Sequence, residues 1–156
     1  MRKWTQLLAL FIGLQLSAQD AEWTSIKDIN PFIGTGGHGH THPSAQAPFG
    51  MIQLGPNTRY DGWDGCGGYH YTDSAMYGFS CTHLSGTGVS DYGDLLILPY
   101  SSPTKEGDHI KFFKEDEHAQ AGYYACILDD GTRIEATAGD RTGILRIRFG
   151  EGSAPG

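Results

Sequence analysis

The fold class is decided by the stretch Gly122-Tyr123-Tyr124-Ala125-Cys126-Ile127-Leu128, which is followed by Asp129-Asp130-Gly131. The first segment is rich in aromatic and apolar side chains, which favour a β-strand. The Asp-Gly pair supplies the positive φ values that a tight turn needs, so the chain is expected to reverse here as a hairpin. The second half of the chain is therefore predicted to be antiparallel sheet.

The strands after this hairpin support the same interpretation. Arg133 to Ala138 is predicted as the return strand, with its apolar residues on one face. After a turn at Gly139-Asp140, Ile144 to Phe149 alternates apolar residues with Arg146 and Arg148, which is the period of a strand. Antiparallel strands with turns about every 8–12 residues indicate an all-β fold, an antiparallel β-sandwich. The linker-like composition of residues 150–156 predicts that this sandwich is incomplete.

The first half of the chain is dominated by glycine. Residues 34–93 hold 14 of the 23 glycines and show no helical period. We expect long Gly-rich loops joined by short strands over Gly50–Leu54, Tyr77–Thr82 and Leu95–Pro99. The continuous apolar run from Leu95 to Leu98 predicts that the last of these strands is buried on both faces.

Length and charge limit the function classes. A chain of 156 residues forms one domain at most. Eleven Lys and Arg residues against 18 Asp and Glu residues give a net charge of −7. A protein that binds nucleic acid by neutralising phosphates carries the opposite sign, so no nucleic acid is expected as a partner.

Residues 1–18 are predicted to be a secretory signal peptide. Arg2 and Lys3 precede an apolar stretch from Leu7 to Leu16, and small residues follow before Gln19. The stretch is shorter than the ~20 apolar residues of a membrane span, so no membrane anchor is expected. The mature domain, residues 19–156, is expected to be exported to a periplasm or to the outside.

The cysteines are odd in number. Cys66, Cys81 and Cys126 leave at least one thiol unpaired within the chain, and the pairing cannot be read from the sequence. Because there is no Cys-x-x-Cys spacing, a thiolate zinc site is not expected.

Three histidines, His38, His40 and His42, are spaced two residues apart in a glycine-rich segment. In an extended segment they would share one face and could bind a metal ion. The alternative is a turn in which the histidines bond to backbone or solvent. We favour this alternative because the closest upstream carboxylate, Asp28, does not complete a site.

Residues 59–71 alternate aromatic rings with acidic residues and glycines. A sugar site needs this mixture, because a ring stacks on the apolar face of a pyranose and carboxylates accept hydroxyl protons. The alternative is a tight loop whose aromatic rings fold into the core, and composition does not separate the two.

Residues 82–94 invite a catalytic-triad interpretation with Ser85, His83 and Asp91. We do not favour it, because the Gly-x-Ser-x-Gly turn is absent. Asp91 and Asp94 could be paired carboxylates or calcium ligands, but such residues more often form turns and caps.

Several blocks resemble, in order, the family 92 glycoside hydrolases. The opening block, Asn30-Pro31-Phe32-Ile33-Gly34-Thr35-Gly36-Gly37-His38-Gly39-His40-Thr41, is the most specific. His42 stands where the family usually has phenylalanine. The resemblance spans residues 29–149 and includes the blocks 30–41, 48–54, 61–71, 78–94, 122–124, 135–137 and 141–143.

This resemblance implies a fold, an activity and a set of contacts. Family members are secreted, calcium-dependent exo-α-mannosidases that invert the anomeric carbon and act on α-mannoside glycans such as N-glycan mannose. An N-terminal β-sandwich packs on a C-terminal (α/α) barrel, which holds both catalytic carboxylates and most of the calcium site. The resemblance therefore assigns no catalytic residue and no metal ligand in this chain. It implies substrate contacts at Trp63, Asp64, Cys66 and His83.

Three functional hypotheses follow. The leading one is that the sequence is the N-terminal part of an exo-α-mannosidase, ends before the (α/α) barrel and is inactive alone. The second is a stand-alone mannose-binding sandwich. The third is a non-functional fragment, which would expose apolar surface and unpaired strand edges.

Overall fold

The computed structural model describes residues 25–86, 93–101 and 107–151. The predicted signal peptide and the last five residues lie outside this part. Within it, the strands are short and antiparallel, and every helical segment is a three-residue 3-10 turn. No described helix is long and apolar enough to cross a membrane. In chain order the elements are η1 (Ile26–Asp28), β1 (Ala45–Gln46), β2 (Gln53–Asn57), η2 (Trp63–Gly65), β3 (Ala75–Met76), β4 (Gly78–Ser80), β5 (Ile110–Lys111), η3 (Lys114–Asp116), β6 (His118–Gln120), β7 (Tyr123–Ile127), β8 (Arg133–Ala138) and β9 (Gly143–Arg148).

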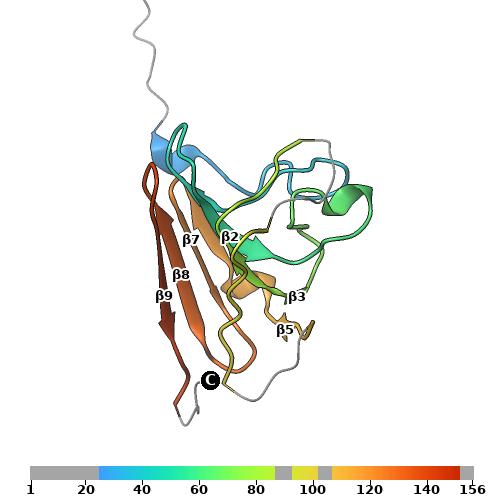
Figure 1. Cartoon of the computed structure of the whole chain (residues 1–156), viewed down its shortest axis with the longest axis vertical. Helices are drawn as coiled ribbons and strands as arrows, with labels where there is room; N and C mark the ends of the chain where they lie inside the picture. Colours follow the sequence, from blue (N-terminus) through green and yellow to red (C-terminus); the bar gives the residue numbers. More distant parts are fainter. Residues whose placement is uncertain (1–24, 87–92, 102–106, 152–156) are drawn as a thin grey trace, which may run out of the picture.

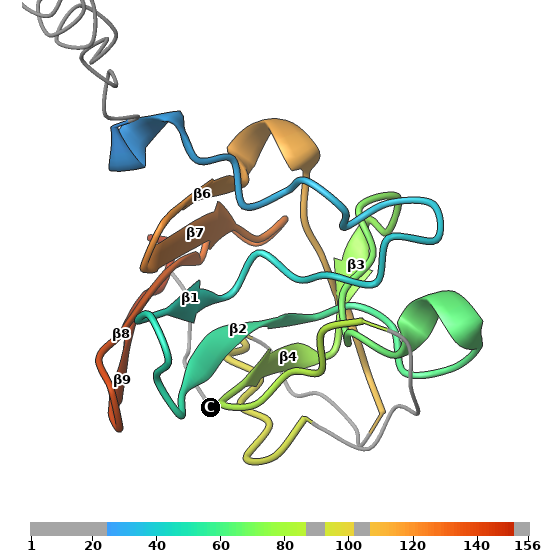
Figure 2. The same cartoon turned by 90° about the horizontal axis from the view of Figure 1, so that it is seen from above.

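Two sheets form the layers of a sandwich (Figures 1 and 2). One is four-stranded with the order β6-β7-β8-β9, and the other is three-stranded with the order β1-β2-β4. Strands β1 and β2 contact β7, β8 and β9, so the sheets pack against each other. A separate two-stranded ladder joins β3 to β5. The predicted all-β fold is confirmed.

The core lies between the two layers. Tyr124 and Ile134 are fully buried on the four-stranded sheet, and Leu54 and Phe79 face them from the other. The Phe79 and Tyr124 rings lie 5.9 Å apart, centroid to centroid. The buried set is Ala45, Leu54, Met76, Phe79, Phe112, Tyr124, Cys126, Leu128, Ile134 and Ala136.

The hairpin predicted around Asp129-Asp130-Gly131 is present. Gly131 has φ +81°, and its N–H donates to the carbonyl of Leu128 at 2.9 Å. The Asp130 carboxylate accepts the Thr132 N–H at 2.9 Å and fixes the turn. In the strand beyond the next turn, Leu145 and Ile147 are half-buried while Arg146 and Arg148 are exposed, as the alternation predicts. Ile144, on the same face as the arginines, is also exposed.

The prediction of a doubly buried strand over Leu95–Pro99 was wrong. Leu95 is 77% exposed, and the segment makes a single bridge, between Ile97 and Phe79, within the described residues. Leu95 has φ +56°, which breaks the extended conformation at the start of the run. An apolar run indicates that its side chains prefer to be buried, but it does not establish that another part of the fold covers them.

Two other predicted strands are shifted or divided. The Gly50–Leu54 prediction corresponds to β2, which begins at Gln53, because Phe49 at φ +58° still belongs to the preceding turn. The Tyr77–Thr82 prediction corresponds to β4 alone. Its neighbour β3 pairs in a different sheet, and Tyr77 separates the two strands, with β4 beginning at Gly78, whose φ is +144°.

The glycine-rich loops gather on one side of the sandwich. Figures 1 and 2 both show the loop through residues 34–41 and the turn η2 on the side away from β8 and β9. This arrangement brings together two segments that the sequence analysis treats separately.

Candidate functional site

The turn η2 presents Trp63 and Asp64. Gly62, at φ +75°, lets the chain enter the turn, and its carbonyl accepts the Gly65 N–H at 3.2 Å. Gly65 has little space for a side chain, since a Cβ there would meet Arg59 Cγ at 3.1 Å. The loop is therefore closely packed beneath the two side chains that it displays.

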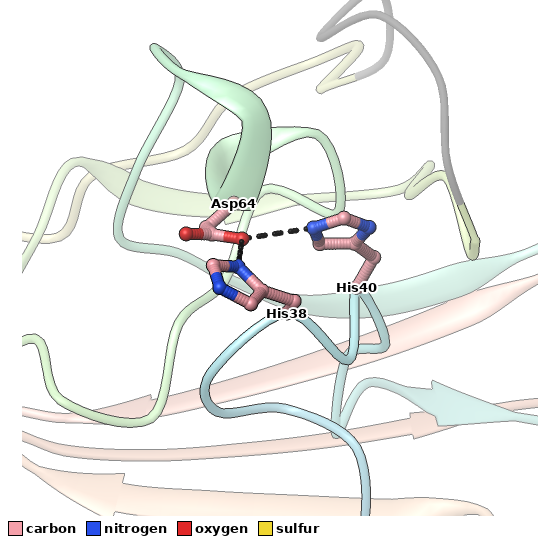
Figure 3. A group of neighbouring side chains, drawn as sticks. All are labelled: His38, His40 and Asp64. Atoms are coloured by element: carbon pink, nitrogen blue, oxygen red, sulfur yellow. Dashed lines mark hydrogen bonds and ion pairs between the residues drawn. The ribbon is translucent and has the colours of Figure 1, made fainter.

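The carboxylate of Asp64 lies between two histidine rings (Figure 3). Its Oδ1 atom lies 2.8 Å from Nδ1 of His38 and 2.9 Å from Nε2 of His40. A carboxylate only accepts, so both ring nitrogens carry the hydrogen in this arrangement. These hydrogen bonds, led by that of His38, lower the pKa of the Asp64 carboxyl and favour its ionised form.

The loop that carries the two histidines has a demanding backbone. A Cβ at Gly39 would lie 2.0 Å from the carbonyl oxygen of Gly34, so only glycine fits there. The Thr41 N–H donates to that same carbonyl at 3.2 Å. His40 has φ +55°, a left-handed conformation that is uncommon for residues other than glycine. The Gly86 N–H donates to the His40 carbonyl at 2.8 Å and holds it there.

Trp63 is the exposed aromatic ring of this site. It is 58% exposed, and the His40 ring meets it edge-on at 5.0 Å between centroids with an interplanar angle of 80°. His40 therefore contacts both Trp63 and Asp64. An exposed indole beside an ionised carboxylate is the pairing that a pyranose can use.

The other two predicted contact residues are buried. The Cys66 thiol donates to the Gly86 carbonyl at 3.1 Å, and Cys66 is 3% exposed. His83 lies with Nε2 3.0 Å from the Pro56 carbonyl oxygen. Burial lowers the pKa of His83 and favours the neutral ring. The structure thus brings Trp63 and Asp64 together on the surface and places Cys66 and His83 inside.

The three histidines do not share one face, as the less favoured metal hypothesis required, and only His38 and His40 lie together. His42 is turned inward, and its ring lies 4.8 Å from that of His83. Asp64 takes the place of the third member, and the carboxylate that the sequence analysis did not find is 24 residues from His40. Asp64 is not a sequence neighbour of the histidines, and the signal for it is the Trp63-Asp64-Gly65 block downstream.

The residues of the rejected triad do not assemble in the described part. His83 Nδ1 lies 3.3 Å from the Ser44 hydroxyl, and the hydrogen bonds of its ring do not include Ser85. Asp91 lies outside the described residues. Asp94 accepts the Thr82 hydroxyl at 3.2 Å, a contact between residues 12 apart and not a local turn or cap.

The cluster of His38, His40 and Asp64 does not fit a calcium ion. Among the described residues, it is the one group of three or more His, Cys, Asp or Glu side chains whose ligand atoms lie close together. Calcium takes oxygen ligands, so a group with two imidazoles is unsuited to it. A separate cavity of about 280 Å³ lies beside Asp73 and His109 and does not include Trp63.

Comparison with known proteins gives consistent matches. Residues 28–156 match the Glycosyl hydrolase family 92 N-terminal domain. An uncharacterized secreted glycosidase of Arthroderma benhamiae is 28% identical over 162 residues, covering 97% of this chain and 21% of that protein.

Solved structures agree with these matches. A family GH92 α-mannosidase of Bacteroides thetaiotaomicron, in complex with mannoimidazole, has a TM-score of 0.76 and 38% identity, covering 81% of this chain and 18% of its own. A further GH92 family glycosyl hydrolase has a TM-score of 0.74 and 31% identity, covering 84% and 20%. The chain spans about a fifth of the length of the relatives that it matches.

Proposed function

Since this chain belongs to the family of glycosyl hydrolase family 92 N-terminal domains, we propose that it is the N-terminal, carbohydrate-contacting part of an exported exo-α-mannosidase. The observation that carries the proposal is the 38% identity to the Bacteroides thetaiotaomicron α-mannosidase over 81% of this chain. Export is supported by the fungal relative, which is described as secreted, and by the predicted signal peptide.

The geometry supports a sugar contact at Trp63 and Asp64. The exposed Trp63 indole offers a flat apolar surface for a pyranose, and the ionised Asp64 can accept its hydroxyl protons. His40 contacts both side chains and limits their movement, so they lose less conformational entropy when the sugar binds. Trp63 and Asp64 would cover only one side of a bound sugar. The complete site needs residues on the opposite side, because small ligands bind tightly only when most of their surface is buried.

We propose that an (α/α) barrel in the complete enzyme supplies the opposite side of the sugar-binding site. In this proposal the barrel also supplies the acid and the base of an inverting hydrolysis, about 6.5–9.5 Å apart, and the calcium site. No step is assigned to a residue of this chain beyond binding the sugar. A contact from Cys66 or His83 stays a prediction, and the buried positions of both side chains suit support of the loop beneath Trp63.

The test uses the native secreted polypeptide that carries this sequence. We expect an intact mass several times 16.9 kDa and calcium-dependent release of mannose, first as the β-anomer, from α-mannosides. Replacing Trp63 with alanine should lower kcat/KM about tenfold or more, because lost stacking and apolar contact are worth ~1.4 kcal/mol or more. Phe113→Ala, which removes a similarly exposed ring from another loop, is the matched control.

Two results would contradict the proposal. One is a normal kcat/KM in the Trp63→Ala enzyme. The other is a native polypeptide near 16.9 kDa that binds mannose but does not hydrolyse α-mannosides, which would favour the stand-alone binding module.

A further inference from the structure

We propose that His38, His40 and Asp64 form a binding site for one divalent transition-metal ion of the zinc type. The three ligand atoms are Nδ1 of His38, Nε2 of His40 and an oxygen of Asp64, and all lie within 4.8 Å of one another. Figure 3 shows both rings directed at the same carboxylate. The inference goes beyond the proposed function and does not depend on it.

The donor types select the metal class. Neutral imidazole and carboxylate together suit zinc, copper, nickel or ferrous iron, whereas calcium and magnesium take oxygen ligands. The site is therefore different in kind from the calcium site expected in the complete enzyme. Three protein ligands leave a fourth position of a tetrahedral zinc ion open to water.

The two distances between a ring nitrogen and the carboxylate are close to those of a metal site. Zinc–nitrogen bonds of about 2.0–2.1 Å place tetrahedral ligands about 3.3 Å apart. The present N···O separations of 2.8 and 2.9 Å belong to hydrogen bonds and would have to lengthen by about 0.5 Å. The two ring nitrogens lie within 4.8 Å of each other and would have to come closer, by up to about 1.5 Å. The His38 side chain is 82% exposed and has room for this movement, while the His40 side chain is 3% exposed and fixed.

The backbone indicates that the position of His40 is costly to hold. His40 lies in the left-handed region at φ +55°, next to Gly39, where a Cβ would collide with a carbonyl oxygen at 2.0 Å. Strained residues of this kind concentrate at functional sites. This backbone strain is independent of the distances between the ligand atoms. It occurs at His40, the more buried of the two histidines.

Metal binding exchanges protons in a defined way. Each ring nitrogen that now donates to Asp64 must give up its hydrogen to bind the ion through its lone pair. In a neutral ring, that proton is taken up at the ring's other nitrogen, and an imidazolium ring releases one proton to solvent. The carboxylate enters already ionised, and no oxidant or reductant is needed.

The test is a zinc titration of the native secreted protein after chelator treatment, followed by calorimetry. We expect one zinc ion per His38/His40/Asp64 site, no displacement by millimolar calcium, and a cobalt complex with visible d–d absorption. Replacing Asp64 with asparagine or His38 with alanine should weaken zinc binding about 100-fold or more, since even outer contacts of a metal site cost 10–100-fold. His118→Ala, at an exposed histidine on β6, is the matched control.

His38→Ala is the decisive variant, because the exposed side chain can be removed without disturbing the core, as an unchanged melting curve would verify. Absence of zinc binding in the native protein would overturn the proposal. Unweakened binding in both His38→Ala and Asp64→Asn would also overturn it. Mannose binding by the metal-free protein is measured separately, so failure of the sugar proposal is distinguishable from failure of this one.

Discussion

The rings of His42 and His83 lie 4.8 Å apart, centroid to centroid, inside the molecule. They differ in their partners, because His83 bonds to backbone carbonyls while neither ring nitrogen of His42 has a hydrogen-bond partner among the described residues. Burial, and then the neighbouring His83, lowers the pKa of His42 to about 3. His42 is thus a polar side chain in a position where the family resemblance expects phenylalanine.

We expect His42→Phe to stabilise the protein at neutral pH by about 1–3 kcal/mol, since it removes two unsatisfied buried polar atoms. Free energies of unfolding from urea titrations at pH 7 would measure this. His118→Phe, on the surface, is the control. A destabilised His42→Phe protein would show instead that the site has no space for the larger ring.

The same variant should change the pH dependence of stability. Native His42 stays neutral down to about pH 3, whereas the unfolded chain takes up a proton below about pH 6.5, so stability falls as pH drops through this range. At pH 5 the loss from this group is about 2 kcal/mol. The difference between wild type and His42→Phe should therefore grow from pH 7 to pH 5, and a constant difference would contradict the assignment.

Glu117 organises a buried polar cluster between η3 and β7. Its side chain is 1% exposed and accepts the Tyr69 hydroxyl at 2.9 Å and the Tyr124 hydroxyl at 2.6 Å. Lys114 Nζ lies 3.0 Å away and neutralises the charge. Burial, with the Glu117 charge as a further cause, raises the pKa values of Tyr69 and Tyr124, which keeps both hydroxyls as donors.

We expect Glu117→Ala to cost about 3 kcal/mol of unfolding free energy, because it leaves two hydroxyls and the partly buried Lys114 ammonium group without their acceptor. Glu117→Gln should cost less, since the amide oxygen still accepts. The exposed Glu115, in the same turn, is the control, and its change to alanine should alter stability by no more than about 0.5 kcal/mol. Equal effects at both positions would contradict this account.

Glu135 on β8 should contribute to acid sensitivity. The Tyr123 hydroxyl at 2.7 Å and the Arg146 Nε at 2.7 Å bond to its carboxylate and lower the pKa of Glu135 from 4.5 to about 2. The resulting stability is present above pH 4.5 and is lost as pH falls toward about 2. Glu135→Gln should flatten this acid limb in urea midpoints measured from pH 5 to pH 2. Glu151→Gln, at an exposed residue, should leave it unchanged.

The thiols should differ in reactivity. Cys66, Cys81 and Cys126 are all free, and Cys81 is the one that is not buried. Burial raises the pKa of Cys126 to about 12, which suppresses its thiolate. We expect a disulfide-exchange reagent to titrate Cys81 in the native protein and all three thiols in denaturant. Fewer than three in denaturant would reveal a disulfide and contradict the free state of the three thiols.

Local patterns were sufficient for the second half of the fold. The Asp-Gly turn and the alternation after it depend on φ preferences and on side-chain period, which act over a few residues. They correctly predicted the strands β7, β8 and β9 and the connection between the first two. The run at Leu95 was misread because burial depends on a covering layer that no local pattern encodes.

The sequence by itself determined the all-β class, the hairpin, the glycine-rich loops and the family resemblance, because turn chemistry and specific blocks are local properties of a chain. Only the tertiary structure decided which side chains meet. It brought Asp64 to His38 and His40 across 26 and 24 residues, and it turned His42 away to His83. Such contacts arise because the packed sheets set the positions of distant loops. The backbone of His40, at φ +55°, then places its imidazole against the Asp64 carboxylate, and no local sequence pattern relates these two residues.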